Sequence, residues 1–138
     1  MNYRKFGRTG LEVSEIGFGG APAGLRNYLG HWEPEGEESA AQIAQAIARA
    51  VDLGINYFDT APGYGNGASE RMFGLAIRPY RERVILASKL FAESADDVRR
   101  SVEASLERLQ VERLDVIQIH GTWYKDDEVS RIFAPGGV

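Results

Sequence analysis

The chain has 138 residues, of which 43% are hydrophobic and 26% charged, proportions typical of a single globular domain with a real core. Its net charge of −4 and pI of about 5.2 argue against a nucleic-acid partner or an anionic membrane surface. The lack of cysteine excludes disulfides, thiolate metal sites and cysteine nucleophiles. No apolar run approaches the roughly 20 residues that cross a bilayer, and the N-terminus does not resemble a signal peptide. We therefore expect one soluble, cytoplasmic domain over residues 1–138.

The N-terminal segment predicts a β-hairpin followed by a first strand. The runs "NYRKF" and "LEV" lie on either side of "GRTG", whose glycines suit a tight turn. A short apolar strand follows at residues 16–19 and ends in the glycine-rich stretch "GFGGAP". A hairpin ahead of the first strand cannot belong to a parallel sheet, so we expect it to cover one open end of that sheet.

Strand and helix patterns then alternate along the chain. Helices are expected at about residues 39–54, at 69–77 and from residue 94 to 109, and strands at 55–60, 84–90 and 114–120. The two longer helices each carry apolar residues on one face, as helices that cover a sheet do. The units repeat at roughly 30 to 40 residues, the size of a βαβ unit, which predicts a parallel α/β architecture.

Three sequence patterns mark the expected helix ends. Ser39 and Gln42 form a capping-box pattern at the start of the first long helix, and Gly54 is a natural stop at its end. Ser94 with Asp97 is expected to begin the last of these helices.

Two architectures can hold such βα units. An open, doubly wound sheet of flavodoxin type suits this length and binds a flavin or nucleotide where the strand order reverses. A (β/α)₈ barrel typically needs about 250 residues, so this chain would supply its first half. The dinucleotide fingerprint fails on context, because Pro22 occupies the place of the third glycine and no helix pattern follows directly. The loops therefore favour the barrel.

Polar residues and glycines gather at the expected carboxyl ends of the strands, which converge on one site in a barrel. These positions are Gly19 and Gly20, then Asp59, then Lys89 and finally His120, with Tyr64 in the loop after the second strand. Gly63 and Gly65 are expected to allow the sharp turn that aims Tyr64 back over the strand end.

Three motifs in this order, "FDTAPGYGNGASE", "ASKL" and "DVIQIHG", resemble the aldo-keto reductase family, and "RTGLEVSEIGFGG" is similar to the family's opening hairpin and first strand. The resemblance covers essentially the whole chain. It implies a (β/α)₈ barrel that transfers a hydride between NADPH, or less often NADH, and a carbonyl or alcohol. It also implies the catalytic residues Asp59, Tyr64, Lys89 and His120, and leaves Gly19, Gly20, Ala21 and Asp59 as candidate cofactor contacts.

Carbonyl reduction explains why these residue types are needed. Negative charge builds on the carbonyl oxygen as hydride reaches carbon, so a proton donor must stand beside that oxygen. Tyr64 is the expected donor, and the Lys89 ammonium favours the phenolate that proton transfer leaves. Asp59 is expected to keep Lys89 charged and oriented. His120 is expected to hydrogen-bond the carbonyl oxygen, either to orient the substrate or to relay a proton.

Each of these residues also has a simpler structural interpretation. Asp59 could cap the turn that follows it, Tyr64 could lie on the surface, and His120 could be a structural histidine. Lys89 is harder to explain in this way, because an unpaired lysine in an apolar strand is costly. The occurrence of all four residues at successive strand ends favours the catalytic interpretation.

Aromatic residues in two loops are candidates for the wall of a substrate pocket. Trp32 follows the first strand, next to His31, and Trp123 and Tyr124 follow the fourth. They could equally lie on the surface or pack against a neighbouring helix. The two histidines form neither an H-x-H nor an H-E-x-x-H motif, so we expect no catalytic metal.

The length of the chain departs from the family pattern of eight βα units. Later loops supply most of the family's cofactor contacts, whereas this sequence ends at "RIFAPGGV", where a fourth helix is expected to start. We therefore expect residues 1–138 to form a truncated, N-terminal half-barrel. The expected ligands are NADP, with NAD as the alternative, and a small-molecule carbonyl substrate. The alternative function is a non-catalytic module that binds cofactor or a partner, and open sheet edges predict self-association or pairing with a complementary half-barrel.

Overall fold

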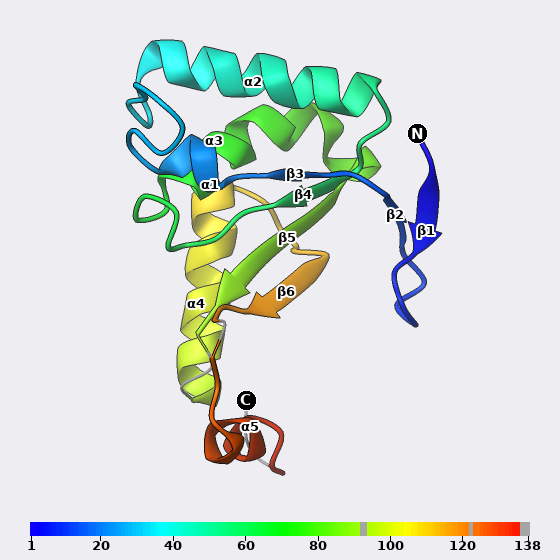
Figure 1. The fold of residues 1–138 in the computed structure, drawn as a ribbon, viewed down its shortest axis with the longest axis vertical. Helices are drawn as coiled ribbons and strands as arrows, with labels where there is room; N and C mark the ends of the chain where they lie inside the picture. The colour runs from blue at the N-terminus through cyan, green and yellow to red at the C-terminus, as the bar shows by residue number, and fades with distance from the viewer. Residues whose placement is uncertain (92–93, 122, 136–138) are drawn as a thin grey trace.

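A computed structural model describes residues 1–91, 94–121 and 123–135 (Figure 1). Two short strands, β1 (Tyr3–Lys5) and β2 (Glu12–Ser14), form an antiparallel hairpin. A second, parallel sheet has the order β3-β4-β5-β6. Its strands are β3 (Gly17–Gly19), β4 (Tyr57–Asp59), β5 (Ile85–Leu90) and β6 (Val116–Ile119). Each strand lies beside its predecessor in the sequence, as in a barrel, whereas a doubly wound sheet would reverse its order at a switch point.

Helices cover one face of the parallel sheet (Figure 1). The helices of the described chain are α1 (Ala21–Gly24), α2 (Glu37–Asp52), α3 (Ala68–Ile77), the 3₁₀ helix η1 (Arg78–Arg83), α4 (Ala95–Leu109) and α5 (Asp126–Ile132). Three of them, α2, α3 and α4, connect successive strands of the sheet, as the sequence predicted. Across the described ranges, no helix is both long enough and apolar enough to cross a membrane.

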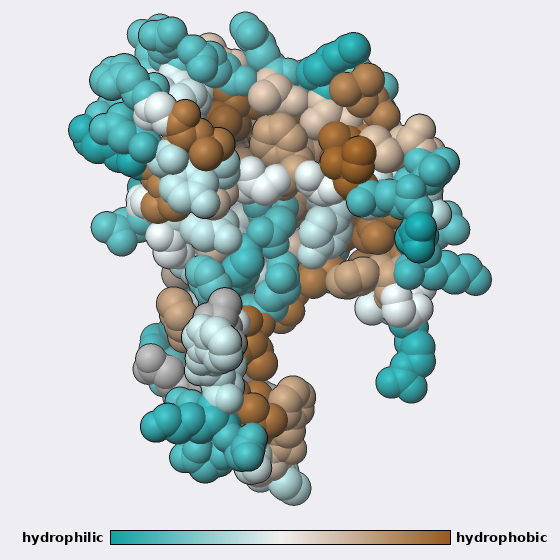
Figure 2. Space-filling model, in the orientation of Figure 1, coloured by the Kyte–Doolittle hydropathy of each residue, from teal (hydrophilic) through white to brown (hydrophobic). Residues whose placement is uncertain are grey.

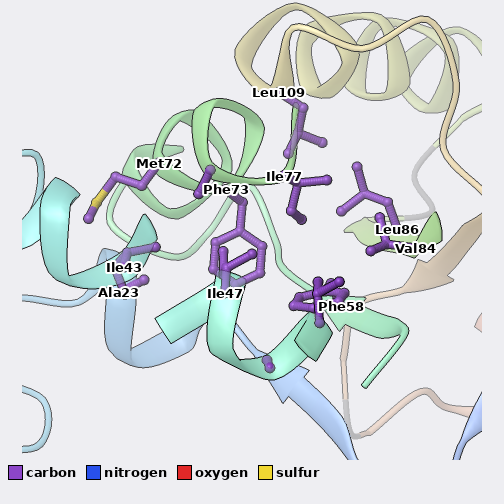
Figure 3. Close-up of a cluster of buried hydrophobic side chains, with 13 residues drawn as sticks. Ala23, Ile43, Ile47, Phe58, Met72, Phe73, Ile77, Val84, Leu86 and Leu109 are labelled. Carbon is purple, nitrogen blue, oxygen red and sulfur yellow. The ribbon is translucent and has the colours of Figure 1, made fainter. Parts of the chain in front are cut away.

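The hydrophobic core lies between the parallel sheet and helices α2, α3 and α4 (Figure 3). Phe58 of β4 and Leu86 of β5 project from the sheet and meet Ile47 of α2 and Phe73 of α3. All four side chains are fully buried. Burial of an apolar side chain of this size contributes roughly 1.5–3 kcal/mol, so this cluster holds the strands in place and thereby fixes the positions of their ends.

The N-terminal hairpin lies against the segment that leads into β4, which confirms that it covers one end of the sheet. The phenol of Tyr3 donates to the carbonyl of Gly54 at 2.8 Å. The rings of Phe6 and Tyr57 lie 5.9 Å apart between centroids. Asn56 accepts a hydrogen bond from the N–H of Ser14 at 2.7 Å. These contacts involve the start of β4, so the opposite, carboxyl ends of the strands stay free of the hairpin.

Two of the predicted helix ends are confirmed. Gly54 adopts a left-handed φ of 85° just after α2, and its N–H donates to the carbonyl of Val51 at 3.0 Å. This is part of the Schellman arrangement that glycine favours at helix ends. At the start of α4, the Ser94 hydroxyl accepts a hydrogen bond from the N–H of Asp97 at 3.2 Å.

The predicted capping box of α2 is wrong. The helix begins earlier, at Glu37, with Gly36 as its N-cap. Ser39 therefore lies inside the first turn, and its hydroxyl donates to the carbonyl of Glu33 at 2.6 Å. The earlier start has a physical reason, because acidic residues such as Glu37 and Glu38 interact favourably with the positive end of the helix dipole.

A buried charge links three elements behind β5. The Glu70 side chain on α3 is fully buried, and Arg108 on α4 donates to its Oε2 at 2.5 Å. Ser88 on β5 donates to its Oε1 at 2.6 Å. Each carboxylate oxygen thus has a donor, which satisfies a charge that would be very costly to bury alone.

The last described strand, β6, is an open edge of the sheet. Ile117 and Ile119 on its helix-side face are 43% and 39% exposed. The chain then runs to α5, which begins before the expected start near residue 131 and lies beyond the carboxyl ends of β5 and β6 (Figure 1). Figure 2 shows hydrophobic surface in brown at this end of the molecule. The helices of the described chain therefore leave part of β6 uncovered.

Candidate active site

Asp59 and Lys89 form an ion pair on the face of the sheet opposite the helices. Successive side chains of a strand alternate, so Phe58 enters the core while Asp59 points to the other face. The Lys89 ammonium donates to Oδ2 of Asp59 at 2.5 Å and to the carbonyl of Thr60 at 2.9 Å. The Lys89 side chain is 11% exposed and that of Asp59 is 26% exposed. The charge of this lysine, which would be costly without a partner, is compensated.

Tyr64 lies next to this ion pair. The Nζ atom of Lys89 is 4.7 Å from the centroid of the Tyr64 ring, a distance at which a cation and an aromatic ring attract each other. The rings of Tyr64 and His120 meet edge to face, with centroids 5.9 Å apart and an interplanar angle of 85°. The structure thus brings the four candidate catalytic residues together in one contiguous cluster.

The loop that carries Tyr64 packs against α1, a helix that the sequence analysis did not predict. Gly65 has a φ of 67°, and a Cβ atom there would lie 1.9 Å from the carbonyl oxygen of Gly24. A Cβ atom at Gly24 would in turn lie 2.2 Å from the carbonyl oxygen of Tyr64. The expected role of Gly65 is confirmed. That of Gly63 is not, because its φ lies outside the left-handed region.

Two polar contacts anchor the segments around this loop. The hydroxyl of Ser69 lies 2.8 Å from that of Thr60 and donates to the carbonyl of Gly20 at 2.8 Å. Arg71 forms a two-bond ion pair with Glu35, at 2.5 and 2.9 Å. The hydrogen bond from Arg71 holds the pKa of Glu35 below its ordinary value. These contacts tie α3, which follows the Tyr64 loop, to the residues just after β3 and β4 and to the segment before α2.

His120 lies between two aromatic rings at the end of β6. Phe91 stacks on the imidazole, with centroids 5.3 Å apart and an interplanar angle of 18°, while Tyr64 meets it edge to face. The phenol of Tyr124 donates to the His120 carbonyl at 2.8 Å. The Nδ1 atom of His120 is buried and has no hydrogen-bond partner in the part of the chain that the structure describes.

Gln118 is a member of this cluster that the sequence analysis did not identify. It lies two residues before His120 on β6, and its side-chain amide donates to Oδ1 of Asp59 at 2.6 Å. The sequence did carry a signal for Gln118, because it is a polar residue in an otherwise apolar strand. It lies two positions before His120, and residues two apart on a strand point to the same face of the sheet. Phe91 was also missed, and it had no comparable signal because an aromatic residue after an apolar strand is common.

The predicted cofactor contacts at the end of β3 differ in how much space surrounds each residue. Gly19 is in register with Asp59, and a Cβ atom there would meet no described atom within 4 Å. Gly20 donates its N–H to the Asp59 carbonyl at 2.7 Å, and a Cβ atom would lie 2.5 Å from Oγ of Ser69. Ala21 begins α1. Gly19 therefore leaves space beside Asp59, whereas Gly20 permits close packing against α3.

The predicted pocket aromatics are dispersed. Trp32 packs against the core, its indole N–H donates to the carbonyl of Ala23 at 2.8 Å, and it lines an apolar cleft with His31. It therefore belongs to the helical layer and not to the cluster around Lys89. Trp123 is 93% exposed. Of the three, Tyr124 is the one that contacts a candidate catalytic residue, through the backbone of His120.

The electrostatics of the cluster also affect Tyr57, which lies two residues before Asp59 on the same face of β4. Burial raises the pKa of the Tyr57 phenol, and the negative charge of Asp59 raises it further. Both effects disfavour the phenolate form of Tyr57. Among the described residues, no group of three or more histidine or carboxylate side chains is arranged to hold a metal ion.

The strand order and the cluster of side chains at the strand ends are consistent with what a comparison with known families shows. A model of the aldo/keto reductase family matches residues 15–133. The chain belongs to this family. The (β/α)₈ barrel type expected from the sequence is confirmed, because the similar solved structures of aldo/keto reductases are barrels of which this chain corresponds to a part.

Relatives of this aldo/keto reductase chain include enzymes and solved structures. L-galactose dehydrogenase of Arabidopsis thaliana is 38% identical over 129 residues, which cover 87% of this chain and 38% of the relative. The holo form of an aldo-keto reductase from Bacillus halodurans is similar with a TM-score of 0.75 at 32% identity, covering 96% of this chain and 45% of that one. An aldo/keto reductase from Klebsiella pneumoniae, in complex with NADP and acetate, gives 0.66 at 29% identity, covering 93% and 44%. The chain spans less than half the length of these relatives.

Proposed function

We propose that residues 1–138 form one domain that carries the proton-donor side of an NADPH-dependent carbonyl reductase site, with NADH as the alternative cofactor. One observation carries this proposal: the Lys89 ammonium lies 2.5 Å from the Asp59 carboxylate and 4.7 Å from the centroid of the Tyr64 ring. A phenol that must release a proton benefits from a fixed positive charge nearby, because that charge stabilises the phenolate.

The residues have distinct roles in this proposal. Tyr64 donates a proton to the carbonyl oxygen of a small aldehyde or ketone as negative charge develops there. Lys89 stabilises the resulting phenolate, and Asp59 holds Lys89 in place. His120 donates a hydrogen bond to the same carbonyl oxygen and orients the substrate. The side chains of Phe91 and Tyr64 keep the imidazole plane fixed while it does so.

The end of β3 fits the side of the site that would hold the cofactor. A nicotinamide cofactor supplies the hydride in this chemistry when it is bound. Gly19 leaves space next to Asp59, and we assign Gly19, Gly20, Ala21 and Asp59 to the cofactor side. The NADP bound to the Klebsiella pneumoniae relative supports NADP as the cofactor.

A non-catalytic module of the same fold is the second candidate function. It is favoured by the similarity of this chain to a probable voltage-gated potassium channel subunit beta of Oryza sativa, which is 30% identical over 133 residues. A binding module needs the fold and one ligand surface, whereas reduction needs the cluster and a complete cofactor site together. Turnover separates the two candidates.

The test uses a complete barrel that contains this chain, made by joining it to the second half of a family barrel. NADPH oxidation is followed by absorbance with 4-nitrobenzaldehyde as the carbonyl probe, and NADPH binding is measured separately by fluorescence. Turnover that depends on both Tyr64 and Lys89 supports the reductase proposal. Binding of NADPH without turnover supports the non-catalytic module, and turnover that survives the loss of both residues contradicts the assigned roles.

A further inference from the structure

Gln118 connects the two outer strands around Lys89. It lies on β6 in register with Lys89 on β5, yet its amide reaches past that strand to Asp59 on β4. The Nε2–Oδ1 distance is 2.6 Å. We propose that Gln118 is a positioning residue, which fixes the Asp59 carboxylate so that the carboxylate holds the Lys89 ammonium beside Tyr64. This inference rests on the proposed reductase function and adds a residue to it.

The geometry gives the Asp59 carboxylate one donor on each oxygen. Lys89 donates to Oδ2 and Gln118 donates to Oδ1. A carboxylate turns easily about its terminal torsion, which has broad and nearly two-fold preferences. Two donors that come from different strands select one orientation of the carboxylate plane. Because a carboxylate accepts only, the glutamine must present its NH₂ group to it.

Simple packing does not require an amide at this position. Side chains alternate along β6, so Gln118 shares a face with Val116 and His120, while Ile117 and Ile119 occupy the other face. An apolar side chain of similar length, such as methionine, would fill the same space. What the amide adds is a donor aimed at a partly buried carboxylate, and that donor is the property to be tested.

Acetylation of lysine measures this property without any need for turnover. The sequence has three lysines, Lys5, Lys89 and Lys125. Lys5 and Lys125 are exposed and serve as internal controls, whereas the Lys89 side chain is 11% exposed. The complete barrel that contains this chain is treated briefly with acetic anhydride, and acetylation at each of these three sites is quantified by mass spectrometry. We expect slow labelling of Lys89 in the unsubstituted barrel, because its ammonium is held by Asp59 and Thr60.

Two variants isolate the amide. Gln118→Met removes the donor at similar length and should raise Lys89 labelling several-fold, with Lys5 and Lys125 unchanged. Ile119→Met on the opposite face of β6 is the matched control and should leave Lys89 labelling as it is. Gln118→Met should add little in an Asp59→Asn background, because the amide acts through that carboxylate.

Several outcomes overturn the proposal. Unchanged labelling of Lys89 in Gln118→Met, or full additivity with Asp59→Asn, shows that the amide does not position the pair. Equal labelling of all three lysines in the unsubstituted barrel shows that the pair itself is not formed. Circular dichroism shows whether each variant keeps its fold. If Gln118→Met does not fold, Gln118→Leu takes its place in the same measurement.

A kinetic readout in the complete barrel addresses catalysis separately. Gln118→Met should lower kcat about tenfold, the effect of losing one hydrogen bond to a charged group, while KM for NADPH stays the same. An unchanged kcat contradicts the positioning role. If the unmodified barrel shows no turnover, the reductase proposal fails, and the acetylation result still decides whether Gln118 positions the ion pair.

Discussion

The Nζ atom of Lys89 lies 2.5 Å from Oδ2 of Asp59, although the two residues are 30 positions apart in the sequence. They meet because β4 and β5 are parallel neighbours whose side chains at these positions point to the same face of the sheet. The Tyr64 ring lies on this ion pair, since its loop turns back between α1 and α3. Lys89 thus lies between a carboxylate that compensates its charge and a phenol whose ionised form this charge would stabilise.

Replacement of Tyr64 by phenylalanine tests the proton donor. In a complete barrel, Tyr64→Phe should reduce the rate of aldehyde reduction by about 10²-fold or more, the usual scale of general acid catalysis. Affinity for NADPH should change little, because the ring is kept and the hydroxyl is not needed to bind a nucleotide. The measurement is steady-state turnover combined with a fluorescence titration. A variant with nearly the original kcat would show that another group donates the proton.

Substitutions in the ion pair test whether Asp59 acts through Lys89. Lys89→Met should abolish measurable reduction, because the phenolate loses its nearby positive charge. Asp59→Asn should be milder, since the ammonium survives and still donates to the carbonyl of Thr60. The double variant should be no worse than Lys89→Met alone. Equal and small losses in both single variants would contradict a coupled pair.

The sequence predicted the architecture well, because its signals there are local and repeated. Alternating strands and helices predicted the parallel sheet, and the glycine after α2 predicted the end of that helix at Gly54. The start of the same helix was misplaced, because Ser39 suits a capping position as well as the first turn it occupies. Such boundaries depend on small local energies that several positions can satisfy.

The candidate site was predictable in its residue types and less so in its contacts. Asp59, Lys89 and His120 lie at the carboxyl ends of successive strands. The alternation of strands and helices in the sequence was enough to predict that these residues share one site. The bond from Gln118 to Asp59 spans 59 residues and depends on the register of three strands, which periodicity does not specify. Likewise, the contact between Gly24 and the Tyr64 loop could not be predicted, since the short helix α1 has no periodic signal of its own.

Gly65 tests how the Tyr64 loop is fixed. Gly65→Ala should lower the free energy of unfolding by more than about 1 kcal/mol, because alanine is strained at a φ of 67° and its Cβ would overlap the Gly24 carbonyl. Gly19→Ala is the matched control for stability, since a Cβ there meets no described atom within 4 Å. Urea unfolding of the complete barrel that carries each substitution measures both variants. Equal stabilities would mean that the loop is not packed against α1 as described.

Because Glu70 is buried, we expect the loss of its ion-pair partner to destabilise the fold far more than the loss of an ion pair at the surface. Arg108→Met leaves a fully buried carboxylate without its cation and should destabilise the fold by roughly 3–5 kcal/mol. Glu82→Gln removes an ion pair with Arg113 that lies at the surface and should have no measurable effect. Thermal unfolding of the complete barrel that carries each substitution provides the comparison. A similar, small change in both would show that Glu70 is not buried as a charged group.

The last prediction concerns the 138-residue chain on its own. Both β3 and β6 are edges of the parallel sheet, and Ile117 and Ile119 of β6 are 43% and 39% exposed. Unpaired edges with apolar side chains recruit other strands. We therefore expect this chain to self-associate or to remain partly molten, with weak NADPH binding. Light scattering gives its mass, and fluorescence titration gives its affinity for NADPH.

A pair of lysine substitutions identifies the surface responsible. Ile117→Lys places a charge on the exposed face of β6 and should reduce the associated mass, because a charged edge disfavours strand pairing. Leu75→Lys introduces the same charge on α3, at a side chain that is 56% exposed but lies outside the sheet, and should leave the mass unchanged. A stable monomer that unfolds cooperatively and binds NADPH with micromolar affinity would contradict the prediction, because such a chain would have no need of a partner for its open edges.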